Sequence, residues 1–164
     1  MENQVNRSEM VLRFLSEPSN INFGGNVHGG AVMKWIDQAG YACAANWCSS
    51  YCVTVYVGGI RFYKPIGIGD IVEIRAKIIY TGKTSMHVGI DVFAGKPQSH
   101  GQHQTTHCVI VFVAVDSSGQ PVSVPKWIPQ TEREKILENY ALKLMELRTG
   151  IDEEIQKLGK IPEK

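Results

Sequence analysis

Residues 71–80 and 84–94 alternate between apolar and polar side chains, which predicts two long β-strands that each bury one face. The polar face of the first strand is charged, so we expect it to be solvated or paired with polar neighbours. On the second strand, His87 falls on the polar face, where we expect it to be solvated and not catalytic. Residues 105–116 are apolar on both faces, which predicts a central strand, and residues 10–15 form a short apolar strand.

A fifth strand is predicted by the alternation of residues 53–57, which resumes at residues 60–64. Between the two parts stand Gly58 and Gly59, which indicate a β-bulge or a close approach of another backbone. Pro65 ends the strand because it cannot donate a ladder hydrogen bond.

A helix is predicted from about residue 29 or 30 to about residue 47, where apolar residues recur at helical spacing. At about 100° per residue, Asp37 falls on the flank of the apolar stripe, between the core and some other surface. A lone carboxylate in apolar surroundings is costly unless it is paired or used. Asp37 is therefore either a general base or nucleophile beside a cleft or subunit interface, or an exposed carboxylate paired with Lys34 or Lys64. The second half of this helix carries small residues, which suit closely wrapped backbone: Gly40, Ala42, Cys43, Ala44 and Ala45.

The segment before the helix is rich in glycine, with four glycines among residues 24–30. Such a segment is often a plain loop. It can also hold an anion or a developing oxyanion, because the first N–H groups of the helix have no intrahelical partner and point into that space.

The C-terminal region predicts a peripheral helix. Thr131 and Glu134 have the spacing of a capping box, and an amphipathic stripe follows to about Arg148. We expect Gly150 to end this helix and a second helical turn to span residues 152–158. The order of elements predicts an α+β fold: a strand, one small-residue helix, four antiparallel strands and a last helix.

The length of 164 residues predicts one domain over residues 1–164, with a core at about 10–128 and a helical extension at about 130–164. The hydrophobic fraction of 43% and the charged fraction of 20% are ordinary for globular proteins. A net charge of +1 argues against nucleic acid or an anionic membrane as the main partner. We expect a cytoplasmic protein, because no apolar signal segment opens the sequence and no apolar run could cross a bilayer.

The cysteines and histidines do not predict a metal site or a disulfide. None of the four cysteines forms a Cys-x-x-Cys pair, and Cys43 and Cys108 lie in apolar segments, where cysteine packs as a small hydrophobe. His100, His103 and His107 are close in sequence, but no cysteine or carboxylate lies among them, so we expect a solvated connection with His107 starting a strand.

Several motifs, in the same order, resemble the hotdog-fold acyl-CoA thioesterases, most closely the acyl-CoA hydrolase branch that includes bacterial single-domain enzymes. These motifs are Gly-Asn-Val-His-Gly-Gly and Trp-Ile-Asp within 25–37, Arg-Phe-Tyr-Lys-Pro-Ile and Gly-Asp within 61–70, Tyr-Thr-Gly-Lys-Thr-Ser-Met at 80–86, and Phe-Val-Ala-Val-Asp-Ser-Ser-Gly-Gln-Pro-Val-Ser-Val-Pro at 112–125. The resemblance implies an antiparallel sheet wrapped around one central helix. It also implies a homodimer with active sites shared between subunits, often assembled further as a trimer of dimers.

The resemblance assigns the thioester chemistry to matching residues. Asp37 would be the general base or nucleophile, and Asn26 from the facing subunit would position the water or the thioester. Backbone N–H groups at Gly29 or Gly30 would hold the carbonyl oxygen, and we favour Gly30. His28 could act as a base, but its place in the motif fits a role in lining the substrate or supporting the loop. The substrate would be an acyl-CoA, and no separate cofactor is expected because coenzyme A is part of the substrate.

Coenzyme A is anionic, so its phosphates would meet cations and hydrogen-bond donors, although these same side chains could be ordinary surface residues. The candidates are Arg61, Lys64, Lys83, Thr84 and Ser85. The acyl chain would need an apolar tunnel beside the helix, and the side chains that could line it could equally be plain core: Met33, Trp35, Tyr41 and Trp47.

Two other functions stay open on fold alone. A hotdog hydratase or dehydratase would use a histidine with an acidic partner, but the segment around Asn26 and His28 lacks the proline of those motifs. A non-catalytic acyl-CoA binding module is the second, and the presence of Asp37 and Asn26 argues against it.

Overall fold

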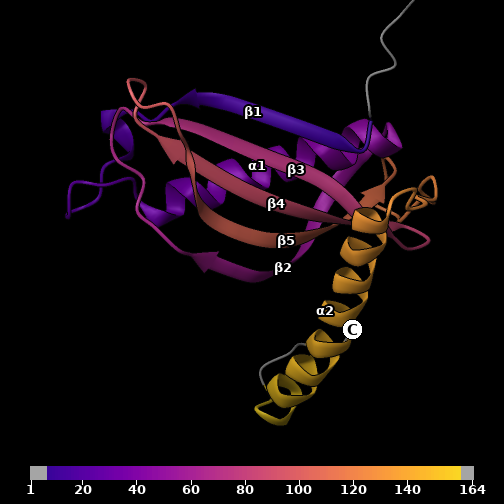
Figure 1. Ribbon diagram of the computed structural model, residues 1–164. Coiled ribbons are helices and arrows are strands. Elements are labelled where there is room, and N and C mark those ends of the chain that lie inside the picture. The colour runs from indigo at the N-terminus through magenta and orange to yellow at the C-terminus, as the bar shows by residue number, and fades with distance from the viewer. Residues whose placement is uncertain (1–6, 160–164) are drawn as a thin grey trace, which may run out of the picture.

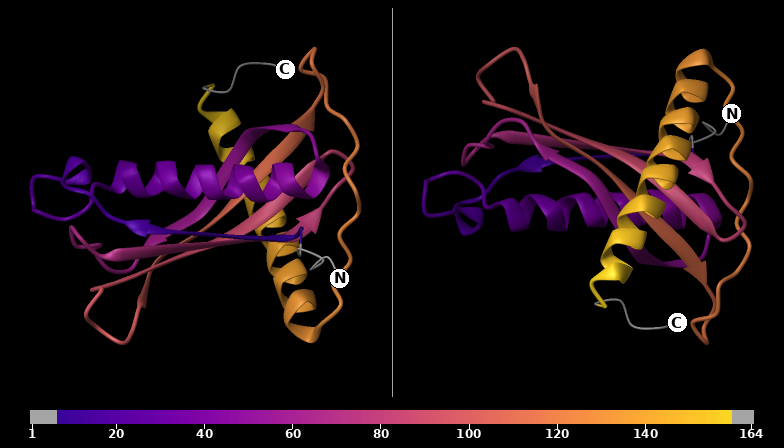
Figure 2. Two further views of the ribbon diagram at one scale, coloured as in Figure 1. Left: turned by 90° about the horizontal axis from the view of Figure 1, so that it is seen from above. Right: turned by 90° about the horizontal axis from the view of Figure 1, so that it is seen from below.

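The computed structural model describes residues 7–159, so the outermost parts of the expected domain, residues 1–6 and 160–164, lie outside the described residues. One antiparallel five-stranded sheet, in the order β1-β3-β4-β5-β2, curves around α1, and α2 crosses its opposite face (Figures 1 and 2). This arrangement confirms the predicted α+β hotdog architecture. The elements are β1 (Glu9–Leu15), a 3-10 turn (Pro18–Asn20), α1 (Gly29–Cys48), β2 (Tyr51–Phe62), β3 (Ile71–Thr81), β4 (Ser85–Gly95), β5 (His103–Val115) and α2 (Glu132–Lys157).

The inner face of the sheet and α1 form the main core. The predicted apolar stripe of α1 is buried against apolar side chains from all five strands. The small residues of α1 allow this close packing. A β-carbon at Gly40 would lie 2.9 Å from the ring of Phe112 and 3.0 Å from Ile90, so a larger side chain there would force the helix away from the sheet.

Strand β2 contains two irregularities in its pairing with β5, one between Thr54 and Tyr56 and one between Gly58 and Arg61. The second confirms the bulge predicted at Gly58 and Gly59, where Gly59 has a φ of +62°. The first bulge has no glycine signal in the sequence. It pairs Thr54 with Phe112 of the inner face and places Tyr56 beside Val111 of the outer face. Thr54 and Tyr56 are two residues apart, so in a regular strand they would point to the same face. The bulge between them makes them point to opposite faces of the sheet.

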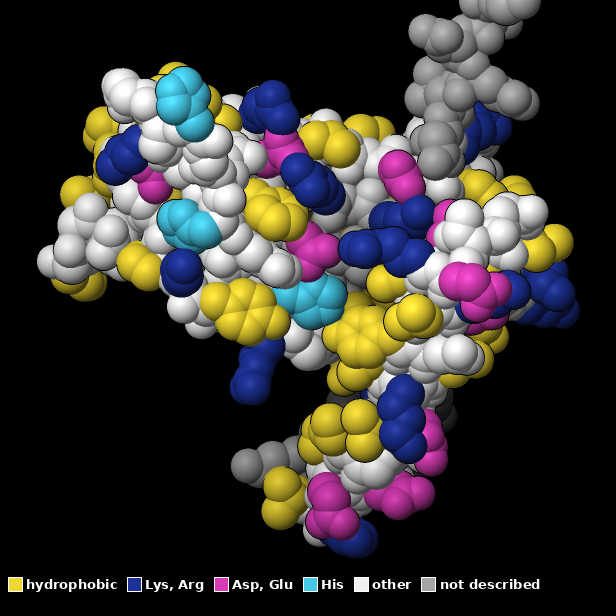
Figure 3. Space-filling model, in the orientation of Figure 1, with side chains coloured by type: hydrophobic (Ala, Val, Ile, Leu, Met, Phe, Trp, Pro, Cys, Tyr) yellow, Lys and Arg dark blue, Asp and Glu magenta, His cyan; other side chains and the backbone are white. Residues whose placement is uncertain are grey.

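The outer face is less exposed than its polar pattern suggests, although charged and histidine side chains remain visible beside α2 (Figure 3). The prediction of a solvated His87 is wrong: α2 covers this side chain and leaves 5% of its surface exposed. Glu73 is 2% exposed and accepts hydrogen bonds from Arg13 and Arg75, as expected for pairing with polar neighbours. The hydrogen bond from Arg13 has the largest effect on the pKa of Glu73, and together with Arg75 it holds that pKa below its ordinary value despite burial.

The C-terminal helix differs from the prediction in its length. The capping box is confirmed, because Thr131 Oγ1 accepts the Glu134 N–H and Glu134 Oε2 accepts the Thr131 N–H. The predicted stop at Gly150 is wrong, since α2 continues without a break to Lys157. A single glycine costs a helix only about 1 kcal/mol, and good helix formers on both sides offset that cost.

The histidine and cysteine predictions are partly confirmed. Cys43 and Cys108 are buried as expected, and burial raises the pKa of each thiol to about 12. His107 lies in a strand, β5, as predicted, and His100 lies in the connection before it. His103 is the exception, because it begins β5 and does not lie in the connection. His107 also contacts other parts of the chain through both ring nitrogens. Of the helices within residues 7–159, none is long and apolar enough to cross a membrane.

Candidate functional site

Asp37 is exposed on α1, at the side of the helix that faces the free edge of the sheet at β2. Its Oδ1 accepts a hydrogen bond of 2.8 Å from the Thr54 hydroxyl. Within residues 7–159, the alternative ion pair with Lys34 or Lys64 does not form. The carboxylate is therefore held by a neutral donor and keeps a second oxygen for other chemistry. Sequence reasoning missed Thr54, because its direction depends on the bulge that follows it in β2.

The glycine-rich loop is organised by Asn22. Its Oδ1 accepts the N–H of Gly24 at 2.8 Å and the N–H of Asn26 at 3.1 Å, so one side chain holds the turn. Gly25 has a φ of +83°, a conformation that glycine adopts without strain. The loop is then tied to the rest of the chain where Val27 N–H donates to the Ile66 carbonyl. Asn22 and Asn26 are both half-buried.

His28 is the N-cap of α1, which confirms a structural role for this residue. Its Nδ1 accepts the Gly30 N–H at 2.9 Å. The N–H that we favoured for the carbonyl oxygen, that of Gly30, is therefore already bonded. Among the hydrogen bonds of residues 7–159, the Gly29 N–H has no acceptor, and Gly29 lines the cleft described next. The local geometry thus favours Gly29 over Gly30 as a donor.

An open cleft of about 320 Å³ lies between the glycine-rich loop and the end of β2. Three of the predicted site residues, Asn26, Gly29 and Lys64, line it together with Asn22. Its apolar walls come from β2 and the segment that follows: Phe62, Tyr63, Pro65 and Ile66. Asp37 does not line this cleft. It follows the N-cap by nine residues, or about 13 Å along the helix axis.

Three of the remaining predicted CoA-binding residues lie at the other end of the sheet. Lys83 and Thr84 lie in the turn between β3 and β4, and Ser85 begins β4. Ser85 pairs with Val113 of β5, which also pairs with Val53 near the start of β2. Helix α1 ends at this end of the sheet, and its last residue, Cys48, lies about 30 Å along the helix axis from its first residue, Gly29. Arg61 lies exposed on β2, paired with His107. One chain therefore brings Lys64 to the cleft and leaves the Lys83–Ser85 turn far from it.

Within residues 7–159, two of the four side chains expected to line an apolar tunnel beside α1 are exposed and two pack against the core. Met33 and Tyr41 are exposed on the same side of α1 as Asp37, and Val55 and Val57 of the edge strand β2 are also exposed. The two tryptophans serve the core: Trp35 packs edge-on against Phe14 at 4.8 Å between ring centroids. Trp47 donates its indole N–H to the Pro125 carbonyl at 2.9 Å.

The chain resembles known proteins along most of its length. A family model described as the thioesterase superfamily matches residues 24–99. The acyl-CoA thioester hydrolase YciA of Escherichia coli is 34% identical over 124 residues, which is 74% of this chain and 94% of YciA. The crystal structure of an apo-hexameric acyl-CoA thioesterase superposes with a TM-score of 0.86 at 32% identity, covering 90% of this chain and 95% of that one.

The acyl-CoA hydrolase of Staphylococcus aureus, solved in complex with butyryl coenzyme A and coenzyme A, superposes with a TM-score of 0.84 at 26% identity and covers 93% of both chains. Variants of that protein with an alanine in place of one polar residue have also been solved. The replaced residues are an aspartate, an asparagine fifteen residues before it and a threonine seventeen residues after it.

Proposed function

The chain belongs to the acyl-CoA thioester hydrolases of the thioesterase superfamily and is an acyl-CoA hydrolase, and on this premise we propose that Asp37 is its catalytic carboxylate. The observation that carries the proposal is the 2.8 Å hydrogen bond from Thr54 to an exposed Asp37, which forms no salt bridge within residues 7–159. Thr54 fixes the orientation of one carboxylate oxygen and leaves the other for the reaction.

The reaction cleaves the C–S bond of the thioester with one water molecule. As general base, Asp37 removes a proton from the water while the water oxygen attacks the carbonyl carbon, and the departing thiolate then takes a proton to become coenzyme A. As nucleophile, Asp37 attacks the carbonyl itself, and water hydrolyses the resulting anhydride. A single turnover in ¹⁸O-labelled water separates these routes, because only the nucleophilic route can carry a carboxylate oxygen of Asp37 into the product acid.

The donors for the carbonyl oxygen come from a second subunit in our proposal. Within one chain the Asn26–Gly29 loop and Asp37 are separated along α1. Met33 is exposed on the same side of α1 as Asp37, and Val57 is exposed on β2, the edge strand of the sheet. Antiparallel pairing of two β2 edges would set two α1 helices side by side in opposite directions, with each Asp37 nearer the partner's loop. The hexameric thioesterase relative supports a higher oligomer built from such dimers.

The same pairing would complete the binding site for coenzyme A. In an antiparallel dimer, the end of one subunit that carries the Lys83–Ser85 turn meets the end of its partner that carries Lys64. Two cationic groups that are far apart in one chain would then lie beside one substrate, where they can meet its phosphates. We propose this role for Lys64 and Lys83, with Thr84, Ser85 and Arg61 as further donors.

Asn22 is a second candidate for the asparagine role that we predicted for Asn26. Asn22 precedes Asp37 by fifteen residues and Thr54 follows it by seventeen, the separations of the residues replaced in the S. aureus hydrolase. Asn22 also lines the cleft and holds the loop through two hydrogen bonds. The position of Asn22 at the start of the glycine-rich segment is a sequence signal for this role. The resemblance assigned the role to Asn26, which stands closer to the helix.

Replacement of the catalytic carboxylate tests the function directly. We expect Asp37→Asn to lower the rate of thiol release from a panel of acyl-CoA substrates at least about a hundredfold, because a general base or nucleophile contributes on this order. The control is Glu132→Gln, which removes an exposed carboxylate from the first turn of α2 and should leave the rate unchanged. Near-full thiol release by Asp37→Asn would contradict the proposed role. Acyl-CoA binding without any thiol release by the unmodified protein would favour a binding module instead.

Mixed oligomers test the shared site and separate the two asparagines. Asp37→Ala is co-assembled with Asn22→Ala or with Asn26→Ala, each inactive partner being tagged differently. If the sites span subunits, the effective asparagine variant should restore about a quarter of the wild-type rate in a random mixture, since half the dimers then hold one intact site of two. Absence of recovery in verified mixed oligomers would place Asp37 and the asparagine in one chain. An asparagine variant that is fully active alone is not the catalytic partner.

A further inference from the structure

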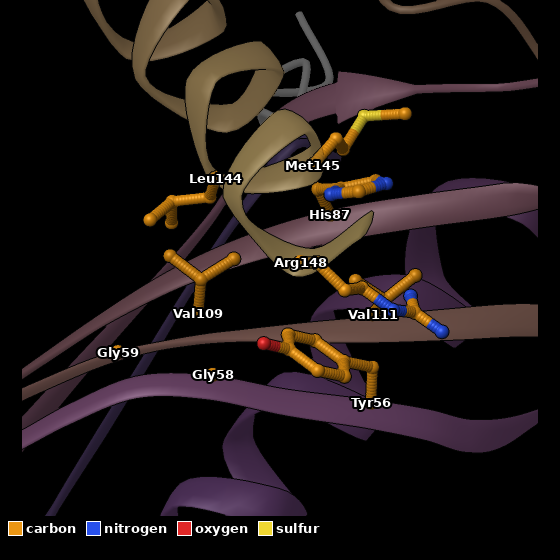
Figure 4. Close-up of a pocket in the computed structure, with 9 residues that line it drawn as sticks. All are labelled: Tyr56, Gly58, Gly59, His87, Val109, Val111, Leu144, Met145 and Arg148. Atoms are coloured by element: carbon orange, nitrogen blue, oxygen red, sulfur yellow. The ribbon is translucent and has the colours of Figure 1, made fainter. Parts of the chain in front are cut away.

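Helix α2 packs on the outer face of the sheet through one stripe of residues. Ala141 is fully buried there, and Leu144 and Arg148 lie over Val109, Val111 and Tyr56 (Figure 4). The Arg148 guanidinium lies 4.2 Å from the centre of the Tyr56 ring. The stripe thus reaches β2, the last strand of the sheet, two turns before the helix ends.

The same stripe continues where the chain's own sheet has ended. At helical spacing it runs from Leu144 and Arg148 to Ile151, Ile155 and Leu158. These three side chains are 52%, 36% and 65% exposed. The C-terminal half of α2 extends past β2 (Figures 1 and 2), and apolar side chains gather on this projecting part (Figure 3). The first part of the stripe packs on the outer face of a sheet. Its exposed continuation is therefore suited to pack on a further sheet face of the same kind.

We propose that the distal segment of α2, residues 149–158, packs on the outer face of the sheet of a second copy of this chain, beside that copy's β2. The inference rests on the β2-edge dimer of the proposed function. Pairing of two β2 edges continues the sheet, and hence its outer face, in the direction in which α2 projects. The distal segment is about 15 Å long, which matches the width of about three neighbouring strands. Each α2 then clamps the partner subunit, and the edge pairing is reinforced from the face opposite to α1.

The test compares two charge-matched double variants in the full-length protein. Ile151→Glu with Ile155→Glu places two carboxylates in the stripe. Thr149→Glu with Gln156→Glu places two carboxylates in the same segment, about 120–140° away on the opposite face. We expect the stripe variant to raise the dissociation constant of the dimer at least about a hundredfold, because two buried apolar side chains become charged, and the control to leave it unchanged. Sedimentation and native mass spectrometry across protein concentrations measure the dissociation constant of the dimer. Far-UV circular dichroism monitors whether each variant folds.

Each outcome decides between the inference and its premise. Equal dissociation constants for the stripe and control variants, with a wild-type oligomer, would overturn the role of α2 and leave the β2-edge dimer and Asp37 untouched. A wild-type protein that stays monomeric at every concentration would overturn the dimer and the α2 contact together, whatever the hydrolysis rate. If the stripe variant does not fold, Ile151→Ala with Ile155→Ala replaces it, with an expected increase of about tenfold in the dissociation constant. An unchanged constant in that variant also overturns the inference.

Discussion

The two faces of the same sheet are covered by helices in different ways. On the inner face, α1 lies along the sheet and buries an almost entirely apolar surface, including Phe112 and Ile90. On the outer face, α2 crosses the strands and covers only part of them, with Ile79, Val109 and Ala141 as its small apolar centre. The inner interface is continuous and apolar, whereas the outer interface also buries polar groups.

The polar groups under α2 illustrate the second kind of interface. His107 is held at Nδ1 by Asp91 at 2.7 Å and at Nε2 by the Tyr140 hydroxyl at 3.0 Å. His87, by contrast, is covered mainly by apolar side chains and by Arg148. Desolvation and then the charge of Arg148 lower its pKa from the ordinary 6.5 to about 4. An interface of this kind depends on hydrogen bonds and on pH in a way that the inner core does not.

The largest difference between the faces should appear when a large side chain is removed. We expect Phe112→Ala to reduce the free energy of unfolding by about 3–5 kcal/mol, because it leaves a cavity in the apolar inner core under Gly40. Val109→Ala, on the outer face under α2, should cost about 2 kcal/mol for its two lost methyl groups. Urea denaturation of both variants measures the difference. Equal losses would mean that the outer interface is as continuous as the inner one.

A second difference should appear on acidification. The folded protein binds a proton at His87 only near pH 4, whereas the unfolded chain binds it near pH 6.5, so stability falls as the pH drops from about 6.5 to about 4. The contribution of His87 is about 3 kcal/mol over that range. His87→Gln should flatten the fall in urea midpoint between pH 7 and pH 4.5, and His100→Gln, in an exposed loop, should not. An equally steep fall in both variants would contradict the burial of a neutral His87.

The smallest effect should come from the hydrogen bond between α2 and β5. Tyr140→Phe removes the hydroxyl that contacts His107 and should cost about 1 kcal/mol of unfolding free energy. Tyr41→Phe, whose ring lies exposed on α1, serves as the control. Hydrogen exchange should also speed up at the amides of α2 and not at those of α1. Unchanged exchange in α2 would show that Tyr140 does not hold this helix to the sheet.

The candidate site shows the same division between local and distant information. The motifs predict that Asp37, the glycine-rich loop and the N-terminus of α1 form the site, and all three lie within one stretch of the chain. Thr54 was missed because its contact with Asp37 needs a bulge in another strand. Gly30 was favoured over Gly29, although the imidazole of His28 occupies the Gly30 N–H. The mixed-oligomer experiment tests whether Asn22 or Asn26 acts with Asp37.

Local pattern alone determined the strands, the course of α1 and the capping box at Thr131, because periodicity and capping depend on residues a few positions apart. It also marked the close approach at Gly40 through the run of small residues. Tertiary structure alone decided that α2 crosses the outer face and buries His87. Those outcomes depend on packing between segments more than thirty residues apart, where a polar side chain is covered or exposed according to what lies above it and not according to its neighbours in sequence.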